Sequence, residues 1–151
     1  MNKERLYVYD TTLRDGQQTQ GVQFSLAEKH QIAATLDNLG LDYIEGGWPG
    51  ANPVDSEFFD SKPNLRATFT AFGMTKRSGR SAENDDALNG ILNGATPAVC
   101  LVGKSHDFHV ETALEITLAE NTENITRSIE YVVAKDREAL FDAEHFFDGY
   151  K

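Results

Sequence analysis

Short apolar runs alternate with amphipathic segments along the whole chain. Runs rich in β-branched and aromatic residues predict strands, whereas apolar positions that repeat every three to four residues predict helices. Strands are expected at residues 6–9, 41–44, 67–72, 98–102 and 138–143. Helices are expected at residues 25–39, 53–60, 82–93 and 117–136. Strict alternation of this kind predicts a parallel sheet with right-handed helical crossovers.

The first and the last of these helices carry start signals. Ser25 with Glu28, and Thr117 with Glu120, have the spacing of a capping box, and Gly40 follows the first helix as a stop. The expected buried positions of the first helix are Leu26, Ile32, Ala33, Leu36 and Leu39. Those of the last helix are Leu118, Ile125, Ile129, Val132 and Val133.

The number and order of these elements narrow the fold class. A five-stranded flavodoxin-like sheet normally carries a helix after its last strand, and none is predicted after residue 143. An eight-stranded (β/α)₈ TIM barrel needs about 250 residues. We therefore expect residues 1–151 to be one domain, an α/β parallel sheet that forms the first five strands of a truncated TIM barrel. Sequential strand order 1-2-3-4-5 would support this fold, whereas order 2-1-3-4-5 would indicate an independent five-stranded binding domain.

Composition excludes several classes of protein. The 151 residues include 14 Lys and Arg against 24 Asp and Glu, which gives a net charge of -10 and no basic footprint for nucleic acid or an anionic membrane. Cys100 is the only cysteine, so a disulfide framework and a cysteine-rich zinc site are excluded, and a reducing, cytoplasmic setting is expected. The first residues lack the apolar core of a secretory signal, and no apolar run approaches the ~20 residues of a membrane span.

Polar side chains follow the predicted strands, where functional groups of parallel βα folds collect. Asp15 and Glu144 offer hard oxygen ligands for a divalent cation, to which His109 or His145 would add nitrogen. Arg14 has the planar fork that holds a carboxylate or a developing enolate. Any one of these residues alone is equally well explained as a turn cap or an ion pair. Their convergence on one rim predicts a site.

Four stretches of the chain resemble one enzyme family. They are DTTLRDGQQTQG at residues 10–21, YIEGGWPGANPVDSEFF at 43–59, VGKSHDFHVETAL at 102–114 and LFDAEHFFDGYK at 140–151. The resemblance is to the acyl-CoA condensing and cleaving enzymes, which include 2-isopropylmalate, homocitrate and citramalate synthases and hydroxymethylglutaryl-CoA lyase. Citramalate synthases are the most similar of these.

The resemblance implies a reaction. An acetyl-CoA methyl group is deprotonated to an enolate, the enolate attacks a 2-keto acid held by a divalent metal (Mg, Mn or Zn), and the thioester is hydrolysed. For a citramalate synthase the keto acid is pyruvate and the pathway is branched-chain amino-acid biosynthesis. The alternatives are a 2-isopropylmalate or homocitrate synthase-type chain, or a non-catalytic five-stranded βα binding domain.

The resemblance also implies roles for individual residues. Asp15 matches the metal-binding aspartate, and Arg14 matches the arginine that steadies the keto oxygen or enolate in catalysis and substrate binding. Glu45 and Glu144 match acids at the ends of the second and fifth strands, with Glu144 as a candidate base. Further substrate contacts are implied for Gln18 and His109.

The chain departs from the family pattern in ways that matter for activity. Relatives usually carry Trp at the position of His106, and the His-x-His pair that completes the metal site in the family does not occur in this sequence. We therefore expect the chain alone to lack synthase activity. The basic cluster at residues 76–80 is near enough in sequence to a strand end to meet coenzyme A phosphates, although a solvated loop is the favoured interpretation.

An open half-barrel predicts self-association. Its inner face and its two edge strands would meet water, and apolar exposure of several hundred Å² costs about as much as a domain's whole stability. The exposed side chains are expected to include Tyr7, Tyr9, Ile44, Phe69 and Phe141. We therefore expect a homo-oligomer.

Overall fold

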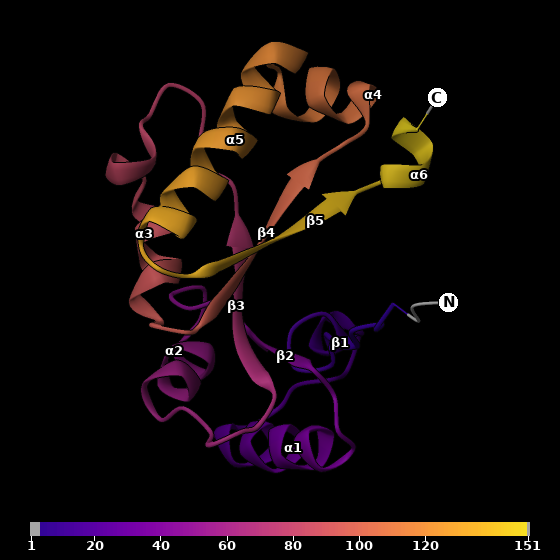
Figure 1. Cartoon of the computed structure of the whole chain (residues 1–151), viewed down its shortest axis with the longest axis vertical. Coiled ribbons are helices and arrows are strands. Elements are labelled where there is room, and N and C mark those ends of the chain that lie inside the picture. The colour runs from indigo at the N-terminus through magenta and orange to yellow at the C-terminus, as the bar shows by residue number, and fades with distance from the viewer. Residues whose placement is uncertain (1–3, 151) are drawn as a thin grey trace.

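The computed structural model describes residues 4–150 of the chain, which form one sheet of five parallel strands (Figure 1). The strands are β1 (Tyr9–Asp10), β2 (Tyr43–Gly47), β3 (Thr68–Met74), β4 (Ala98–Lys104) and β5 (Glu138–Glu144). They pair in the order β1-β2-β3-β4-β5. Sequential order confirms the curled half-barrel and rules out the order 2-1-3-4-5.

Four longer helices connect the strands and pack against the sheet. They are α1 (Leu26–Asn38), α2 (Pro53–Asp60), α3 (Asp86–Asn93) and α5 (Leu118–Ala134). In Figure 1, α2, α3 and α5 lie on the same side of the strands. The shorter elements are two 3-10 turns (Gly16–Gln18 and Ala82–Asn84), α4 (Asp107–His109), a π-helical turn (Val110–Leu114) and α6 (Phe146–Gly149). The opposite face of the sheet borders an open cleft.

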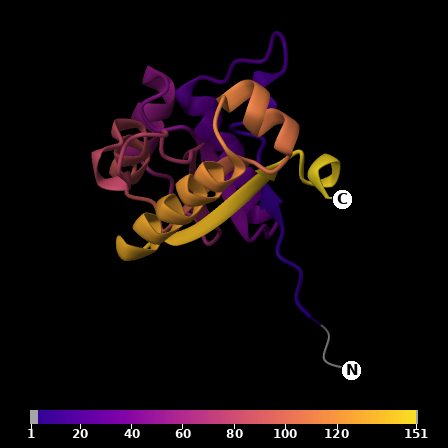
Figure 2. The same ribbon diagram turned by 90° about the horizontal axis from the view of Figure 1, so that it is seen from above.

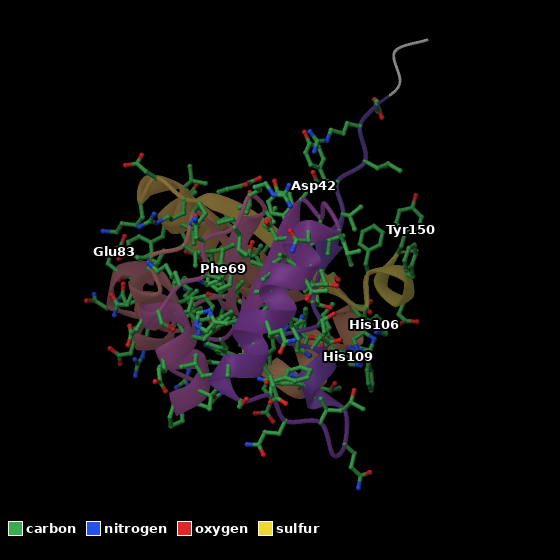
Figure 3. All side chains as sticks on the ribbon, turned by 90° about the horizontal axis from the view of Figure 1, so that it is seen from below. Asp42, Phe69, Glu83, His106, His109 and Tyr150 are labelled. Atoms are coloured by element: carbon green, nitrogen blue, oxygen red, sulfur yellow. The ribbon has the colours of Figure 1, made fainter. Side chains whose placement is uncertain are left out.

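The apolar core lies between the sheet and these helices. Phe69 of β3 is buried there (Figure 3). Its ring meets the ring of Phe58 of α2 edge-on at a centroid distance of 5.3 Å. Ile44 is fully buried in the same layer. The prediction that Ile44 and Phe69 lie on the exposed inner face was therefore wrong, because side chains alternate along a strand and these two point toward the helices.

The first strand is shorter than its apolar pattern predicts. Residues 6–8 are exposed, and Figure 2 shows this segment leading away from the sheet. The Val8 N–H donates to the Asp42 carboxylate at 2.9 Å, and Arg5 pairs with the same side chain. The side chain of Asp42 thus takes a backbone donor that a regular ladder would use, and only Tyr9–Asp10 pairs with β2 as a strand.

Capping residues set the starts of the helices. Ser25 and Glu28 form the expected capping box of α1, and Thr117 accepts the Glu120 N–H at the start of α5. The segment predicted as one helix over residues 82–93 is instead a 3-10 turn followed by α3. Asp85 separates them, because its carboxylate accepts the Leu88 N–H at 2.9 Å and caps α3.

The expected apolar stripes were wrong at three positions, since Leu39, Leu118 and Val133 are exposed. The buried face of α5 carries Val132 together with three polar residues, Asn121, Asn124 and Ser128. Asn121 donates to the Lys104 carbonyl at 2.9 Å, which explains why an amide is stable there.

Candidate functional site

A cleft of about 850 Å³ opens over the inner face of the sheet, at the C-terminal ends of the strands. Five of the six residues expected in a site line it, namely Arg14, Asp15, Gln18, Glu45 and Glu144. They come from the ends of β1, β2 and β5. The structure therefore brings these five together, as parallel strand ends in one sheet require.

The turn after β1 fixes the backbone of Arg14. The N–H groups of Arg14, Asp15 and Gly16 all point at the Thr11 carbonyl, at 3.1, 2.8 and 3.2 Å. The Asp10 carboxylate accepts the Thr12 N–H at 2.9 Å, as expected of an aspartate that caps a turn. Leu13 is fully buried and anchors the turn in the core.

The guanidinium of Arg14 is held on three sides. Its Nε donates to Glu45 Oε2 at 2.6 Å, and its Nη1 donates to Asp15 Oδ1 at 3.0 Å. The guanidinium carbon lies 3.8 Å from the centroid of the Phe72 ring. Only 15% of the side chain is exposed, so the cation is largely shielded from water at the wall of the cleft.

Glu45 lies behind Arg14 and is fully buried. Burial raises the pKa of Glu45, and the hydrogen bonds from Tyr9 and Arg14 oppose that shift without cancelling it. Tyr9 Oη donates to Glu45 Oε1 at 2.7 Å, and burial beside this carboxylate moves the pKa of Tyr9 far above its usual value. Burial also raises the pKa of the Cys100 thiol to about 11, which keeps it protonated at neutral pH.

A buried ion pair between Lys29 and Asp55 connects the turn after β1 with the end of β2. Lys29 of α1 is fully buried, and its Nζ donates to the carbonyls of Leu13 at 3.0 Å and Gly46 at 2.9 Å and to the Asp55 carboxylate. Asp55 also accepts the Trp48 N–H at 3.0 Å. The pair therefore ties the turn after β1 to the end of β2 and to α2.

Sequence reasoning missed Lys29, although a signal was present. Position 29 lies three residues after Leu26 and four before Ala33, on the stripe that was expected to be buried. A lysine on an apolar stripe indicates either an error in the stripe or a buried partner, and here the partner is Asp55.

Glu144 closes the far side of the cleft. It stands opposite Lys104 in the pairing of β4 with β5, and the two side chains form an ion pair. His109 lies in α4 and is not among the residues that line the cleft, so the structure does not place it in the cleft with the other five. Figure 3 shows it beside His106. Its ring centroid is 4.3 Å from that of His145, and burial, with His145 next in size, lowers its pKa.

The donor set for a resident metal ion is incomplete. Within residues 4–150, no three His, Cys, Asp or Glu side chains group as a metal site requires. Asp15 is 59% exposed, and one of its oxygens accepts a hydrogen bond from Arg14. A catalytic metal site usually has about three protein ligands. These side chains alone therefore do not fit the metal ion that the resemblance implies.

No helix in the described part of the chain is both long and apolar enough to cross a membrane.

Curated relatives of known name cover nearly the whole chain. The (R)-citramalate synthase of Aquifex aeolicus (strain VF5) is 50% identical over 98% of this chain and 29% of its own length. That of Synechocystis sp. is 46% identical over 99% of this chain and 28% of its own. The 2-isopropylmalate synthase of Listeria innocua is 32% identical over 93% of this chain and 27% of its own length. The chain thus spans between a quarter and a third of the length of these relatives.

Solved structures agree on the fold. The HMG-CoA lyase of Bacillus subtilis superposes with a TM-score of 0.67 at 16% identity, over 92% of this chain and 46% of the lyase. The HMG-CoA lyase of Brucella melitensis superposes with a TM-score of 0.65 at 13% identity, over 92% of this chain and 48% of the lyase. The HMGL-like family model matches residues 5–149. The chain therefore belongs to the HMGL-like family.

Proposed function

We propose that residues 1–151 form the N-terminal five-strand part of the catalytic barrel of an acyltransferase that condenses acetyl-CoA with a 2-keto acid. Pyruvate is the preferred keto acid and citramalate the product, a step of branched-chain amino-acid biosynthesis. The observation that carries the proposal is Arg14, a shielded cation held between Glu45, Asp15 and Phe72 at the cleft. Identity of 44–50% to (R)-citramalate synthases, against 30–32% to 2-isopropylmalate synthases, supports the choice of product.

Arg14 supplies charge where the reaction develops it. When the enolate carbon bonds to the keto carbon, the electron pair of the C=O bond moves onto the keto oxygen. A guanidinium already oriented by the protein stabilises that oxygen more than it stabilises the neutral carbonyl. Glu45 is buried behind Arg14 and fixes its direction through the 2.6 Å hydrogen bond, so we assign Glu45 an orienting role in catalysis.

Glu144 is the candidate base. Its carboxylate is partly exposed on the cleft wall and pairs with Lys104, and a carboxylate at this position can accept a proton from the acetyl methyl group. Gln18 lines the same cleft and is proposed as a substrate contact. His109 lies farther out and would contact only an extended substrate. Water then hydrolyses the thioester and releases coenzyme A.

Asp15 is proposed as one ligand of a divalent metal ion. Because the described residues do not complete such a site, no step is assigned to the metal, and the chain alone is expected to lack synthase activity. A thiol-release assay with pyruvate and acetyl-CoA is expected to stay well below the ~1 s⁻¹ typical of enzymes. Turnover near that rate would overturn this expectation.

Self-association is proposed for the same chain. β1 and β5 are the two edges of the sheet, and apolar side chains such as Phe72, Val102 and Leu140 line the open cleft. A second copy would cover this surface. Sedimentation at micromolar concentration is expected to show a dimer or larger species, and a single monomer would contradict it.

Substrate binding tests the proposed function directly. Titration of the chain with pyruvate and with 2-oxoisovalerate, followed by NMR, is expected to show tighter binding of pyruvate. Arg14→Gln should weaken that binding about tenfold or more, since it removes a charge-assisted hydrogen bond. Arg127→Gln is the matched control, because Arg127 is exposed and pairs with Glu130 on α5. Equal binding by the Arg14 variant and the control would refute the proposal, and tighter binding of 2-oxoisovalerate would favour a 2-isopropylmalate synthase.

A further inference from the structure

A second, smaller hollow of about 220 Å³ lies beside the cleft, between the ends of β3 and β4 and the first half of α5. It shares with the cleft the side chains of Met74, Val102, Lys104 and Glu144. The two are therefore neighbouring parts of one rim, and an elongated ligand can occupy both.

Lys76 forms the wall of this hollow and is only 8% exposed. Its ammonium donates to Asn124 Oδ1 at 2.5 Å, and its backbone N–H donates to Ser128 Oγ at 2.8 Å. Asn124 in turn donates to Ser78 Oγ at 2.7 Å. All of these partners are neutral, and no carboxylate of residues 4–150 lies within ion-pair distance of the Lys76 ammonium.

A buried cation with neutral partners is costly, because its desolvation is only partly repaid. The polar stripe of α5 reduces that cost without neutralising the charge. An anion that entered the hollow would offset the rest of the desolvation cost through charge-assisted hydrogen bonds to Lys76. An apolar residue of similar volume would have filled this position at a lower cost if its role were packing alone.

The lining as a whole is positive although the chain carries a net charge of -10. Three cations face the hollow, Lys76, Arg77 and Lys104, against the single carboxylate of Glu144, which Lys104 already pairs. Arg77 is exposed, and the nearby Asp85 carboxylate already accepts hydrogen bonds from two backbone N–H groups. Ser78 and Asn121 add neutral hydrogen-bonding groups.

We propose that this hollow is a phosphate subsite. It would hold a phosphate group of an elongated phosphorylated acyl donor while the acyl end of that donor lies near Arg14. The identification of the donor as acetyl-CoA rests on the proposed function, whereas the anion site rests on Lys76 and its surroundings alone. The solvated-loop interpretation of residues 76–80 then holds for Arg80, which lines only a different hollow, and not for Lys76, which borders both hollows.

Calorimetric titration of the 151-residue chain at constant ionic strength tests this subsite. The probes are pyrophosphate, coenzyme A and pantetheine, which lacks the phosphates. Arg77→Gln is expected to weaken the binding of pyrophosphate and of coenzyme A about three- to fivefold, as for an ion pair at an exposed position. Arg80→Gln removes the same charge from the same loop and should change the affinity for pyrophosphate or coenzyme A by no more than about 1.5-fold. Pantetheine binding should be equal in all variants.

Lys76→Met is expected to have a larger effect, about tenfold or more, provided that circular dichroism shows it folded. If it does not fold, the comparison of Arg77→Gln with Arg80→Gln decides. Weakened pyrophosphate binding in Arg77→Gln without any coenzyme A binding would support the anion subsite and count against the proposed function. Coenzyme A binding that both arginine variants leave unchanged would overturn the subsite and leave the proposed function intact. Absence of pyrophosphate binding by the parent chain would also overturn the subsite.

Discussion

Replacement of Lys29 by Met tests whether the buried ion pair holds the site loops together. Methionine has a similar length and fills the same space, but it carries no charge and no donor. The variant leaves the Asp55 carboxylate, which is 2% exposed, without its cation and with hydrogen bonds only from the Trp48 N–H and, at 3.5 Å, from Gln17 Nε2 within residues 4–150. It also removes the only side-chain donor that the structure shows for the carbonyls of Leu13 and Gly46 within residues 4–150.

The expected loss is large. Removing one partner of a buried pair typically costs about 3–5 kcal/mol, because the remaining charge is left in a poorly solvated position. A domain of this size is stable by only about 5–15 kcal/mol, so Lys29→Met is expected to remove about a fifth or more of the free energy of unfolding. The exposed pair of Arg127 with Glu130 provides the contrast, since its loss should cost about 0.5 kcal/mol or less.

Urea unfolding monitored by tryptophan fluorescence measures the effect. Trp48 is the only tryptophan, and its backbone N–H bonds to Asp55, so the signal reports on this part of the site. Lys29→Met is expected to lower the urea midpoint by about 1 M or more. The double variant Lys29→Met with Asp55→Asn should lose less than the sum of the single losses, because no unpaired charge remains.

Two results would refute this reasoning. One is a loss below about 1 kcal/mol for Lys29→Met, which would mean that water or another group solvates Asp55 as well as the lysine does. The other is strict additivity in the double variant, which would mean that the two side chains do not interact.

Three further outcomes are expected. Arg14→Gln should raise the pKa of Glu45 further, measured by ¹³C NMR of its carboxyl, because a cation that opposes the burial shift is lost. Burial alone would raise the pKa of Asp85, but backbone N–H bonds hold it below its usual value. The stability it contributes is therefore present above the unfolded pKa of about 4 and lost as pH falls below it, and the melting temperature of Asp85→Asn should fall less between about pH 5 and pH 2. Gly149→Ala should abolish amide-exchange protection in α6, because the added Cβ would lie 2.1 Å from a backbone oxygen. At Gly90 in α3 the added Cβ would meet no atom within 4 Å, so Gly90→Ala should raise the free energy of unfolding by about 0.5–1 kcal/mol.

The sequence was sufficient for the five strands, the four longer helices and their order, because each of these follows a local rule, whereas the short α4 and α6 were not predicted. The capping box at Ser25 is an example, since both of its hydrogen bonds form between residues three apart. The ends of elements were less predictable. Residues 6–8 have the apolar pattern of a strand, but whether they pair depends on Asp42, which is far away in sequence.

The residues of the site were predictable from strand ends, but their partners were not. That Asp15 and Glu45 would lie near Arg14 follows from the topology of a parallel sheet. That Glu45 would be fully buried, with Tyr9 as its hydrogen-bond donor, depends on side-chain packing across β1 and β2. The polar face of α5 is a similar case, because Asn121 and Asn124 are buried only where loops from β3 and β4 reach them.

The error over Ile44 and Phe69 shows how the cleft face of such a sheet can be recognised. Strands of a barrel are covered on both faces and are apolar on both, so hydrophobicity does not determine which alternate positions face the helices. Polar positions do. Glu45 follows Ile44 directly and therefore points to the opposite face, and in β5 Asp142 and Glu144 share one face. The register pairs Lys104 with Glu144 and Val102 with Asp142, which places all of these side chains on the same side of the sheet. A carboxylate inside an apolar strand is costly unless it serves a site or a partner, so the alternate positions that carry carboxylates identify the cleft face from the amino-acid pattern alone.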